Sequence, residues 1–124
     1  MANILVIDDE LPMRRLLTRL LTAAGHTVHA AADGQVGIAL FHEVAPELVI
    51  TDIVMPEMEG IETIRELRRN GRPVPILAIS GGTPPVYLRA AAELGATAAL
   101  PKPFAADALL STVNELLAAA SPPK

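Results

Sequence analysis

The sequence predicts an α/β domain, a doubly wound parallel sheet of five strand–helix pairs. Short apolar runs of strand length alternate along the chain with longer segments whose apolar residues recur at helical spacing. The connections between them are short, and the chain contains no internal repeat. Strand–helix–strand units of this kind have right-handed crossovers, so the carboxyl ends of all five strands should lie at one edge of the sheet.

The predicted strands differ in how apolar they are. Leu48, Val49 and Ile50 form a run bounded by polar residues, which is typical of a strand buried on both faces of a parallel sheet. The strand at 27–31 is half polar, so we expect it nearer an edge. The five predicted strands are 3–7, 27–31, 47–51, 74–79 and 97–100.

The predicted helices begin and end at residues suited to those positions. Pro12 suits a first turn, because the proline nitrogen has no hydrogen to leave unpaired, and Asp33 suits an N-cap. The helices begin near Pro12, Asp33, Ile61, Thr83 and Asp107. The first four end before Gly25, before Pro46, at Asn70-Gly71 and at Gly95.

The composition is that of one globular domain. A chain of 124 residues can bury one core, and we expect the domain to span 1–120, with a flexible tail at 121–124. The net charge of −4 argues against a nucleic-acid surface, and the absence of cysteine excludes disulfides and thiolate metal sites. No apolar run could span a membrane and no signal peptide is visible, so we expect a cytoplasmic protein without membrane contact.

Polar side chains stand at the ends of four predicted strands: Asp8 and Asp9, then Asp52, Ser80 and Lys102. Carboxylates 4 Å apart repel by ~1 kcal/mol per pair in bulk water, and by more where water is scarce. A cluster of them therefore needs shared positive charge, which Lys102 and a cation such as Mg²⁺ can supply. A carboxylate nucleophile, a metal, a lysine and a hydroxyl are together the parts of a phosphoryl-accepting site.

Each of these residues also has a simpler interpretation. Asp8, Asp9 and Glu10 precede a helix, whose N-terminal dipole favours acidic side chains. Asp52 could merely turn the chain after its strand, and Ser80 could be a turn hydroxyl before two glycines. Lys102, between two prolines, could be an ordinary solvated lysine. These interpretations do not explain why the residues follow successive strands, and that coincidence favours one shared site.

With these residues in place, the chain resembles the receiver domain of two-component response regulators, of the stand-alone single-domain type. The resemblance covers essentially the whole chain and implies the flavodoxin-like strand order 2-1-3-4-5. The matching motifs are Ile-Leu-Val-Ile-Asp8-Asp9-Glu, Asp52-Ile-Val-Met-Pro-Glu-Met-Glu-Gly60, the strand end at Ser80, and Lys102-Pro103-Phe104.

The resemblance implies a role for each residue of the predicted metal site. Asp52 would be the phosphoacceptor. Asp9, Asp52 and the backbone carbonyl of Val54 would bind Mg²⁺ or Mn²⁺ directly, and Asp8 would act through water. Lys102 would pair with Asp52 or its phosphoryl group. The family commonly has a cis peptide bond after this lysine, so one is expected before Pro103.

The resemblance also implies a switch, in which Ser80 moves to hydrogen-bond the phosphoryl group. This chain has Ala99 where the family usually places an aromatic residue that moves with that hydroxyl. Val54 and Gly82 occupy positions where relatives often place polar side chains that help water to attack the phosphoaspartate. Tyr87, in the next predicted helix, is a candidate for the partner-binding surface, and an ordinary packing tyrosine is the alternative.

The expected partners are a histidine kinase or a histidine phosphotransfer protein, and an unidentified downstream protein. The domain would receive a phosphoryl group without being an enzyme in its own right. An aspartate-based phosphohydrolase would need a second Asp two residues after Asp52, where this chain has Val54. A constitutive interaction module would be free to lose Asp9, Asp52 or Lys102, and this chain keeps all three.

Overall fold

The computed structural model describes residues 2–53, 59–69, 73–81, 92–93 and 95–120. Strands and helices alternate along the chain, as the sequence predicts. The elements are β1 (Asn3–Ile7), α1 (Leu11–Ala23), β2 (Thr27–Ala31), α2 (Gly34–Val44), β3 (Leu48–Asp52), α3 (Glu59–Arg69), β4 (Ile76–Gly81), β5 (Ala98–Lys102) and α5 (Ala106–Ala120). The helix predicted between Thr83 and Gly95 falls almost wholly outside the described residues.

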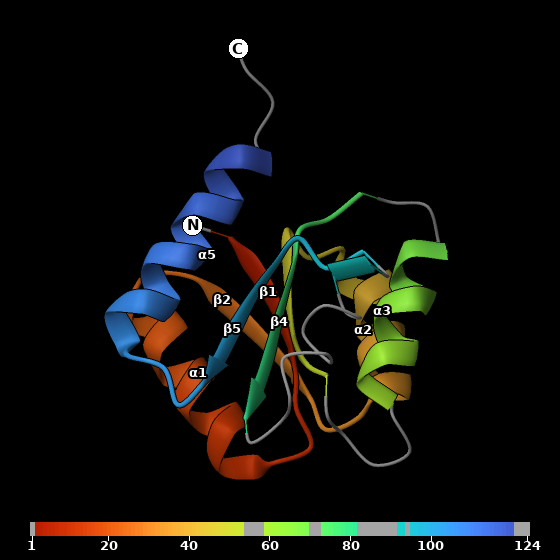
Figure 1. The fold of residues 1–124 in the computed structure, drawn as a ribbon, viewed down its shortest axis with the longest axis horizontal. Helices are drawn as coiled ribbons and strands as arrows, with labels where there is room; N and C mark the ends of the chain where they lie inside the picture. The colour runs from red at the N-terminus through yellow and green to blue at the C-terminus, as the bar shows by residue number, and fades with distance from the viewer. Residues whose placement is uncertain (1, 54–58, 70–72, 82–91, 94, 121–124) are drawn as a thin grey trace.

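The five strands form one parallel sheet in the order β2-β1-β3-β4-β5, which confirms the predicted order. In Figure 1, α1 and α5 cover one face of this sheet, and α2 and α3 cover the other. The arrowheads of β4 and β5 point to the lower edge of the sheet. The carboxyl ends of the strands therefore share one edge, which we call the carboxyl edge.

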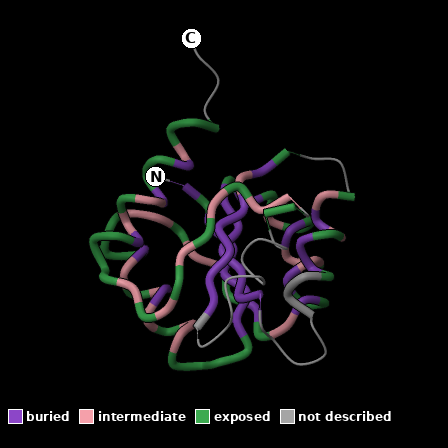
Figure 2. Tube along the Cα trace, viewed as in Figure 1, coloured by how far each residue is buried: buried purple, intermediate pink, exposed green. Residues whose placement is uncertain are grey.

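Successive residues of the central strands pack on opposite faces of the sheet. In β1, Leu5 and Ile7 belong to the core that includes Phe41 of α2, whereas Ile4 and Val6 belong to the core that includes Leu17 of α1. Figure 2 shows the buried strands running through the middle of the molecule. All five residues of β3 are buried, as expected for a strand covered on both faces of a parallel sheet.

Short connections place side chains at the carboxyl edge with little freedom. Glu10 is the N-cap of α1, so only two residues separate that cap from the last residue of β1. Asp33 caps α2 by accepting a hydrogen bond from the amide of Val36 at 2.9 Å, as predicted. Gly25 has a φ of +98°, which suits the predicted stop after α1.

The opposite edge of the sheet is held by Arg68, near the end of α3. Its guanidinium donates to the carbonyl of Gly95 from Nε at 2.9 Å and from Nη2 at 2.6 Å, and to the carbonyl of Val74 from Nη1. Gly95 has a φ of +122°, and a Cβ there would lie 2.8 Å from Cγ of Arg68. These contacts tie α3 to the segments that lead into β4 and β5, the strands that carry Ser80 and Lys102.

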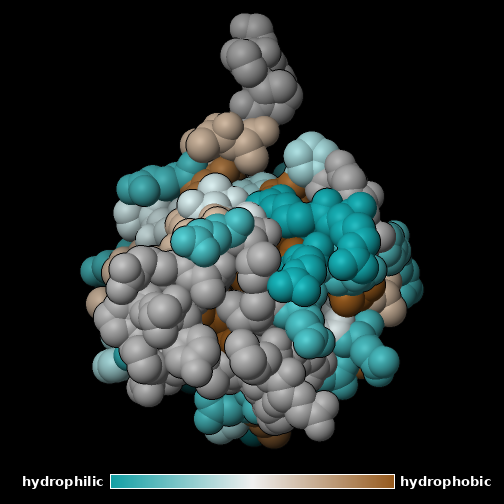
Figure 3. All heavy atoms as spheres, turned by 45° about the vertical axis from the view of Figure 1, so that its right-hand side comes forward, coloured by the Kyte–Doolittle hydropathy of each residue, from teal (hydrophilic) through white to brown (hydrophobic). Residues whose placement is uncertain are grey.

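The described part of the face that carries α2 and α3 is largely polar (Figure 3). Figure 3 turns the α2–α3 side of the molecule forward, and the part of it that is coloured is mostly hydrophilic. Among the described residues, no helix is both long enough and apolar enough to cross a lipid bilayer.

Candidate functional site

Lys102, the last residue of β5, joins two carboxylates at the carboxyl edge. Its Nζ lies 3.1 Å from Oδ2 of Asp8 and 3.0 Å from Oδ2 of Asp52, at hydrogen-bonding distance from both. The three residues come from three different strand ends, with Asp8 following β1 and Asp52 ending β3. The sequence prediction that Asp8, Asp52 and Lys102 meet is confirmed.

These three side chains are withdrawn from water. The side chains of Asp8, Asp52 and Lys102 are 0%, 5% and 11% exposed. Burial of two carboxylates beside one ammonium leaves an excess of negative charge when all three groups are ionised. Such an excess of buried negative charge favours the arrival of a further cation.

The backbone amide, the backbone carbonyl and the carboxylate of Asp8 all take part in hydrogen bonds. Its backbone amide donates to the carbonyl of Ala31 at 3.1 Å, and its Oδ1 accepts from the amide of Glu10 at 2.9 Å. Its own carbonyl accepts from Nη1 of Arg14 at 2.7 Å. The carboxylate is therefore held toward Lys102 by bonds to neighbouring β2 and to the start of α1.

Burial and mutual contact determine the direction in which the pKa values of Asp8 and Lys102 shift. Burial raises the pKa of Asp8 above its ordinary value of 3.8, although the amide of Glu10 and the ammonium of Lys102 oppose that shift. Burial alone would lower the pKa of Lys102, but its contacts with Asp52 and Asp8 raise it above 10.5. Lys102 is therefore a fixed positive charge at neutral pH.

Glu10 is a member of the site that the sequence interpretation missed. One carboxylate oxygen each of Asp8, Glu10 and Asp52 lies within 4.8 Å of the others, and we call these three residues the acidic cluster. Oε1 of Glu10 is 3.7 Å from Nζ of Lys102. An acidic residue just before a helix has an ordinary explanation in the helix dipole, which is why its sequence position gave no signal.

Asp9, a predicted direct ligand of the cation, is exposed and is not a member of the acidic cluster. Val54, the other predicted ligand besides Asp52, lies outside the described residues. The ligand role of Asp9 and of the Val54 carbonyl stays a prediction.

Ser80 lies on the strand between those of Asp52 and Lys102. Along β4, Asp52 pairs with Ile79 on one side, and Lys102 pairs with Gly81 on the other. Ser80 stands between these two register positions and is 3% exposed. The hydroxyl is therefore at the carboxyl edge, close in register to both charged residues.

Some of the remaining predicted residues lie within the described part of the chain, and others lie outside it. The peptide bond between Lys102 and Pro103 is cis, as predicted. Ala99 is exposed on the edge strand β5. Gly82 and Tyr87 lie outside the described residues.

The acidic cluster fits a hard divalent cation. Carboxylate oxygens are the ligands that Mg²⁺ prefers, and one or two carboxylates with water and a phosphate oxygen are its usual protein site. The close approach of three carboxylates, two of them buried, is the observation that supports this fit. Asp8, Asp52 and Glu10 are the described residues that could hold the ion.

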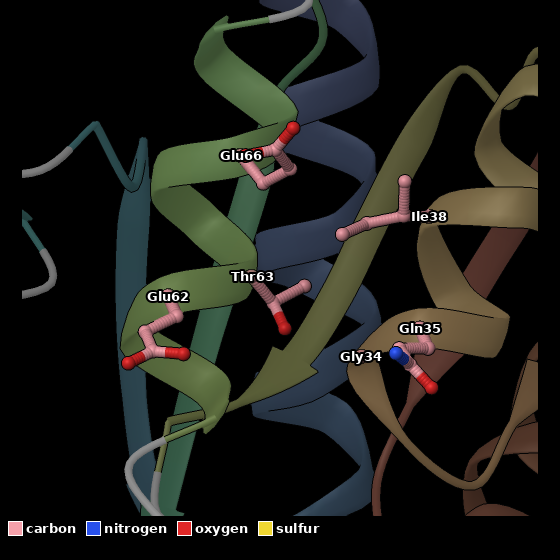
Figure 4. A pocket seen from close by; sticks show the side chains of 6 residues that line it. All are labelled: Gly34, Gln35, Ile38, Glu62, Thr63 and Glu66. Atoms are coloured by element: carbon pink, nitrogen blue, oxygen red, sulfur yellow. The ribbon is translucent and has the colours of Figure 1, made fainter.

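A separate hollow of about 510 Å³ lies between α2 and α3. Figure 4 shows Ile38 of α2 and Thr63 of α3 on facing sides of it. Its lining residues are Gly34, Gln35, Ile38, Glu62, Thr63 and Glu66. None of them belongs to the acidic cluster, so the chemistry of the carboxyl edge does not take place in this hollow.

Comparison with known sequences places these features in context. The profile of the response regulator receiver domain matches residues 4–114. Response regulator MprA of Mycobacterium sp. (strain KMS) is 37% identical over 120 residues, which are 97% of this chain and 52% of the relative. MprA of Mycobacterium avium (strain 104) is 34% identical, and the match covers 97% of this chain and 53% of the relative. The chain thus spans about half the length of these curated relatives.

Solved structures give the same likeness in three dimensions. NtrX from Brucella abortus, in complex with ADP, superposes with a TM-score of 0.91 at 30% identity, over 96% of this chain and 27% of that one. The Vibrio cholerae chemotaxis protein CheY4, crystallised at low pH, superposes with a TM-score of 0.87 at 32% identity. That match covers 94% of this chain and 98% of CheY4.

Proposed function

Because this chain belongs to the response regulator receiver domain family, we propose that it accepts a phosphoryl group on Asp52 from a histidine kinase or a histidine phosphotransfer protein. The observation that carries the proposal is the contact of Lys102 with Asp52 at 3.0 Å and with Asp8 at 3.1 Å. A buried carboxylate can act as the nucleophile, and the fixed ammonium beside it can stabilise the negative charge of a phosphoryl group.

The transfer itself is a displacement at phosphorus. A carboxylate oxygen of Asp52 attacks the phosphorus in line with the phosphorus–nitrogen bond of a phosphohistidine. The new oxygen–phosphorus bond forms as the phosphorus–nitrogen bond breaks, and the imidazole leaves with the bonding electrons. Lys102 already points its ammonium at Asp52, so it can pair with the equatorial oxygens without a large movement.

As the resemblance implies, Asp9, Asp52 and the Val54 carbonyl would bind Mg²⁺ or Mn²⁺ directly, and Asp8 would act through water. A bound cation would neutralise charge on the phosphoryl oxygens. Asp8 has a second task in this chain, because its two oxygens separately accept from the Glu10 amide and from Lys102. It thereby keeps Lys102 in place while Asp52 reacts.

The output of phosphorylation is proposed as a change in partner binding or an onward transfer of the phosphoryl group, without turnover of a small substrate. Ser80 is the hydroxyl placed to follow the added oxygens, since it stands between the register positions of Asp52 and Lys102.

The proposed function is tested by incubating the protein with acetyl phosphate and Mg²⁺ and weighing it by intact mass spectrometry. We expect one phosphoryl group on wild type, none on Asp52→Asn, and none in EDTA. Asp107→Asn, an exposed aspartate at the start of α5, is the matched control and should be labelled like wild type. Labelling of Asp52→Asn at the wild-type rate would contradict the assignment.

A further inference from the structure

We propose that Glu10 is an additional carboxylate of the cation site and strengthens the binding of the divalent cation. The inference rests on the proposed function, since it concerns the cation of the same phosphoryl-accepting site. It starts from the place of Glu10 in the acidic cluster, with its oxygen within 4.8 Å of those of Asp8 and Asp52.

The backbone holds Glu10 firmly at this place. Its amide donates to Oδ1 of Asp8 at 2.9 Å, and its carbonyl accepts from the amide of Arg14 at 3.1 Å in the first turn of α1. Both backbone groups are therefore engaged, one by a buried carboxylate and one by the helix. The side chain can turn only about this fixed point.

The side chain of Glu10 does not cap α1, although Glu10 stands at the N-cap position. Glu10 is the N-cap of α1, yet it makes no side-chain capping hydrogen bond, and its carboxylate lies 3.7 Å from Nζ of Lys102 instead. N-cap side chains usually accept from an amide of the first turn. The carboxylate is thus turned toward the cluster and away from the helix that it begins.

The net charge of the acidic cluster and Lys102 explains why the orientation of Glu10 matters for cation binding. With three carboxylates ionised and Lys102 protonated, the group carries two excess negative charges, which is the charge that one divalent cation neutralises. Glu10 is 65% exposed, so water and salt screen its contribution. We therefore expect it to tune the affinity and not to create the site, which Asp8 and Asp52 can form without it.

An alternative role for Glu10 is that of an ion-pair partner for Lys102 alone. The two roles differ in what a neutral side chain does to cation binding. If Glu10 only paired with Lys102, Glu10→Gln would leave the cation affinity unchanged. If it faces the cation, Glu10→Gln should weaken binding by about 3- to 10-fold, with a smaller effect at high salt.

The test is a calorimetric titration of Mg²⁺, and separately of Mn²⁺, into metal-free protein at low and high salt. Glu10→Gln is compared with wild type and with Glu115→Gln, an exposed glutamate of α5 outside the cluster. Circular dichroism and thermal unfolding check that each variant is folded. A loss of affinity in Glu10→Gln, with Glu115→Gln like wild type, supports the inference.

Equal affinity in wild type and Glu10→Gln would overturn the inference and leave the proposed function standing. An equal loss in Glu10→Gln and Glu115→Gln would also overturn it, because a general loss of negative charge would then explain the result. Wild-type protein that binds neither cation would contradict the proposed function and the inference together. The titration itself separates these failures, because it needs no phosphoryl transfer.

Discussion

Lys102 donates to Asp52 across the strand that separates them. β3 is the central strand and β5 ends the sheet, with β4 between them, yet Nζ of Lys102 lies 3.0 Å from Oδ2 of Asp52. The lysine side chain therefore passes over the end of β4, where Ser80 stands. A phosphoryl group on Asp52 would enter a space already bounded by this ammonium and this strand end.

Loss of the ammonium should destabilise the fold as well as slow the chemistry. In Lys102→Met, the carboxylates of Asp8 and Asp52 lose the partner they share, and we expect the free energy of unfolding in EDTA to fall by about 1–3 kcal/mol. Saturating Mg²⁺ should restore part of the loss, because the cation can replace the missing charge. Urea denaturation with and without Mg²⁺ measures both effects.

The pH dependence of this variant provides its control. Since the pKa of Lys102 is raised above 10.5 in the folded protein, its stabilisation is complete below 10.5 and is lost as pH rises through the folded pKa. The gap between wild type and Lys102→Met should therefore be constant near neutral pH and shrink in strong alkali. A gap of zero at neutral pH would show that the ammonium contributes nothing to stability.

Asp8 differs from Lys102 because its neutral form, and not its charged form, is the one that the fold favours. Its folded pKa is raised above 3.8, so the folded state holds the proton more tightly, and its contribution to stability declines as pH rises through the raised pKa. Asp8→Asn removes that cost and keeps an oxygen for the Glu10 amide. We expect the variant to be more stable than wild type in EDTA at neutral pH.

The advantage of Asp8→Asn should disappear as pH is lowered toward and below 3.8, where wild type is protonated too. Chemical denaturation over a pH series in EDTA measures it. An advantage that is the same at every pH would point to altered packing as its cause, and a less stable variant at neutral pH would contradict the charge explanation.

The phosphoaspartate should be long-lived for this family. Val54 and Gly82 carry neither an amide nor a carboxylate to orient the attacking water, so the positioning and general-base contributions are missing. Replacing Val54 with Asn and Gly82 with Glu should speed phosphate loss by roughly 10-fold or more. The decay is followed by intact mass spectrometry after removal of the phosphodonor, and unchanged decay would show that access of water to the site controls the lifetime.

The switch should depend on Ser80 and be visible at Tyr87. The chain has one tyrosine and no tryptophan, so intrinsic fluorescence reports on Tyr87 alone. Phosphorylation adds about −1.5 to −2 charges with three acceptor oxygens, and Ala99 offers no bulk to fill the space that a moving hydroxyl leaves. Mg²⁺ with beryllofluoride should change the emission of wild type, and far less that of Ser80→Ala.

The matched controls for this prediction are Mg²⁺ alone and Asp52→Asn with the full mixture, neither of which should change the emission. No change in wild type, together with normal partner binding by Tyr87→Ala, would remove Tyr87 from the mechanism. A full change in Ser80→Ala would instead place the switch at another residue.

The sequence predicted the parts of the site that backbone topology determines. Asp8, Asp52 and Lys102 meet, and Ser80 lies close to them in register, because parallel strands end at one edge and apolar runs reveal where strands end. The spacing of apolar residues does not determine which strands pair, so the strand order was predicted from the resemblance to a family. β3 is buried throughout and β2 is partly exposed, which agrees with a central and an edge strand.

The parts that sequence could not predict depend on side-chain direction. Glu10 faces Lys102 and the cluster although its position suits a helix cap, and nothing in the residue type distinguishes the two orientations. The end of α2 is a different case: Ala45 follows Val44 in the left-handed region at φ 47°, although no glycine stands there. The proline after Ala45 did signal that end.

The central claim is that Asp52 is the residue that receives the phosphoryl group, and borohydride trapping tests it most directly. Borohydride reduces an aspartyl phosphate to homoserine, which peptide mass spectrometry can assign to one position. After incubation with acetyl phosphate and Mg²⁺, we predict homoserine at position 52 alone, and none when EDTA replaces Mg²⁺. Homoserine at position 8 or 9, or equal trapping with and without Mg²⁺, would contradict the claim.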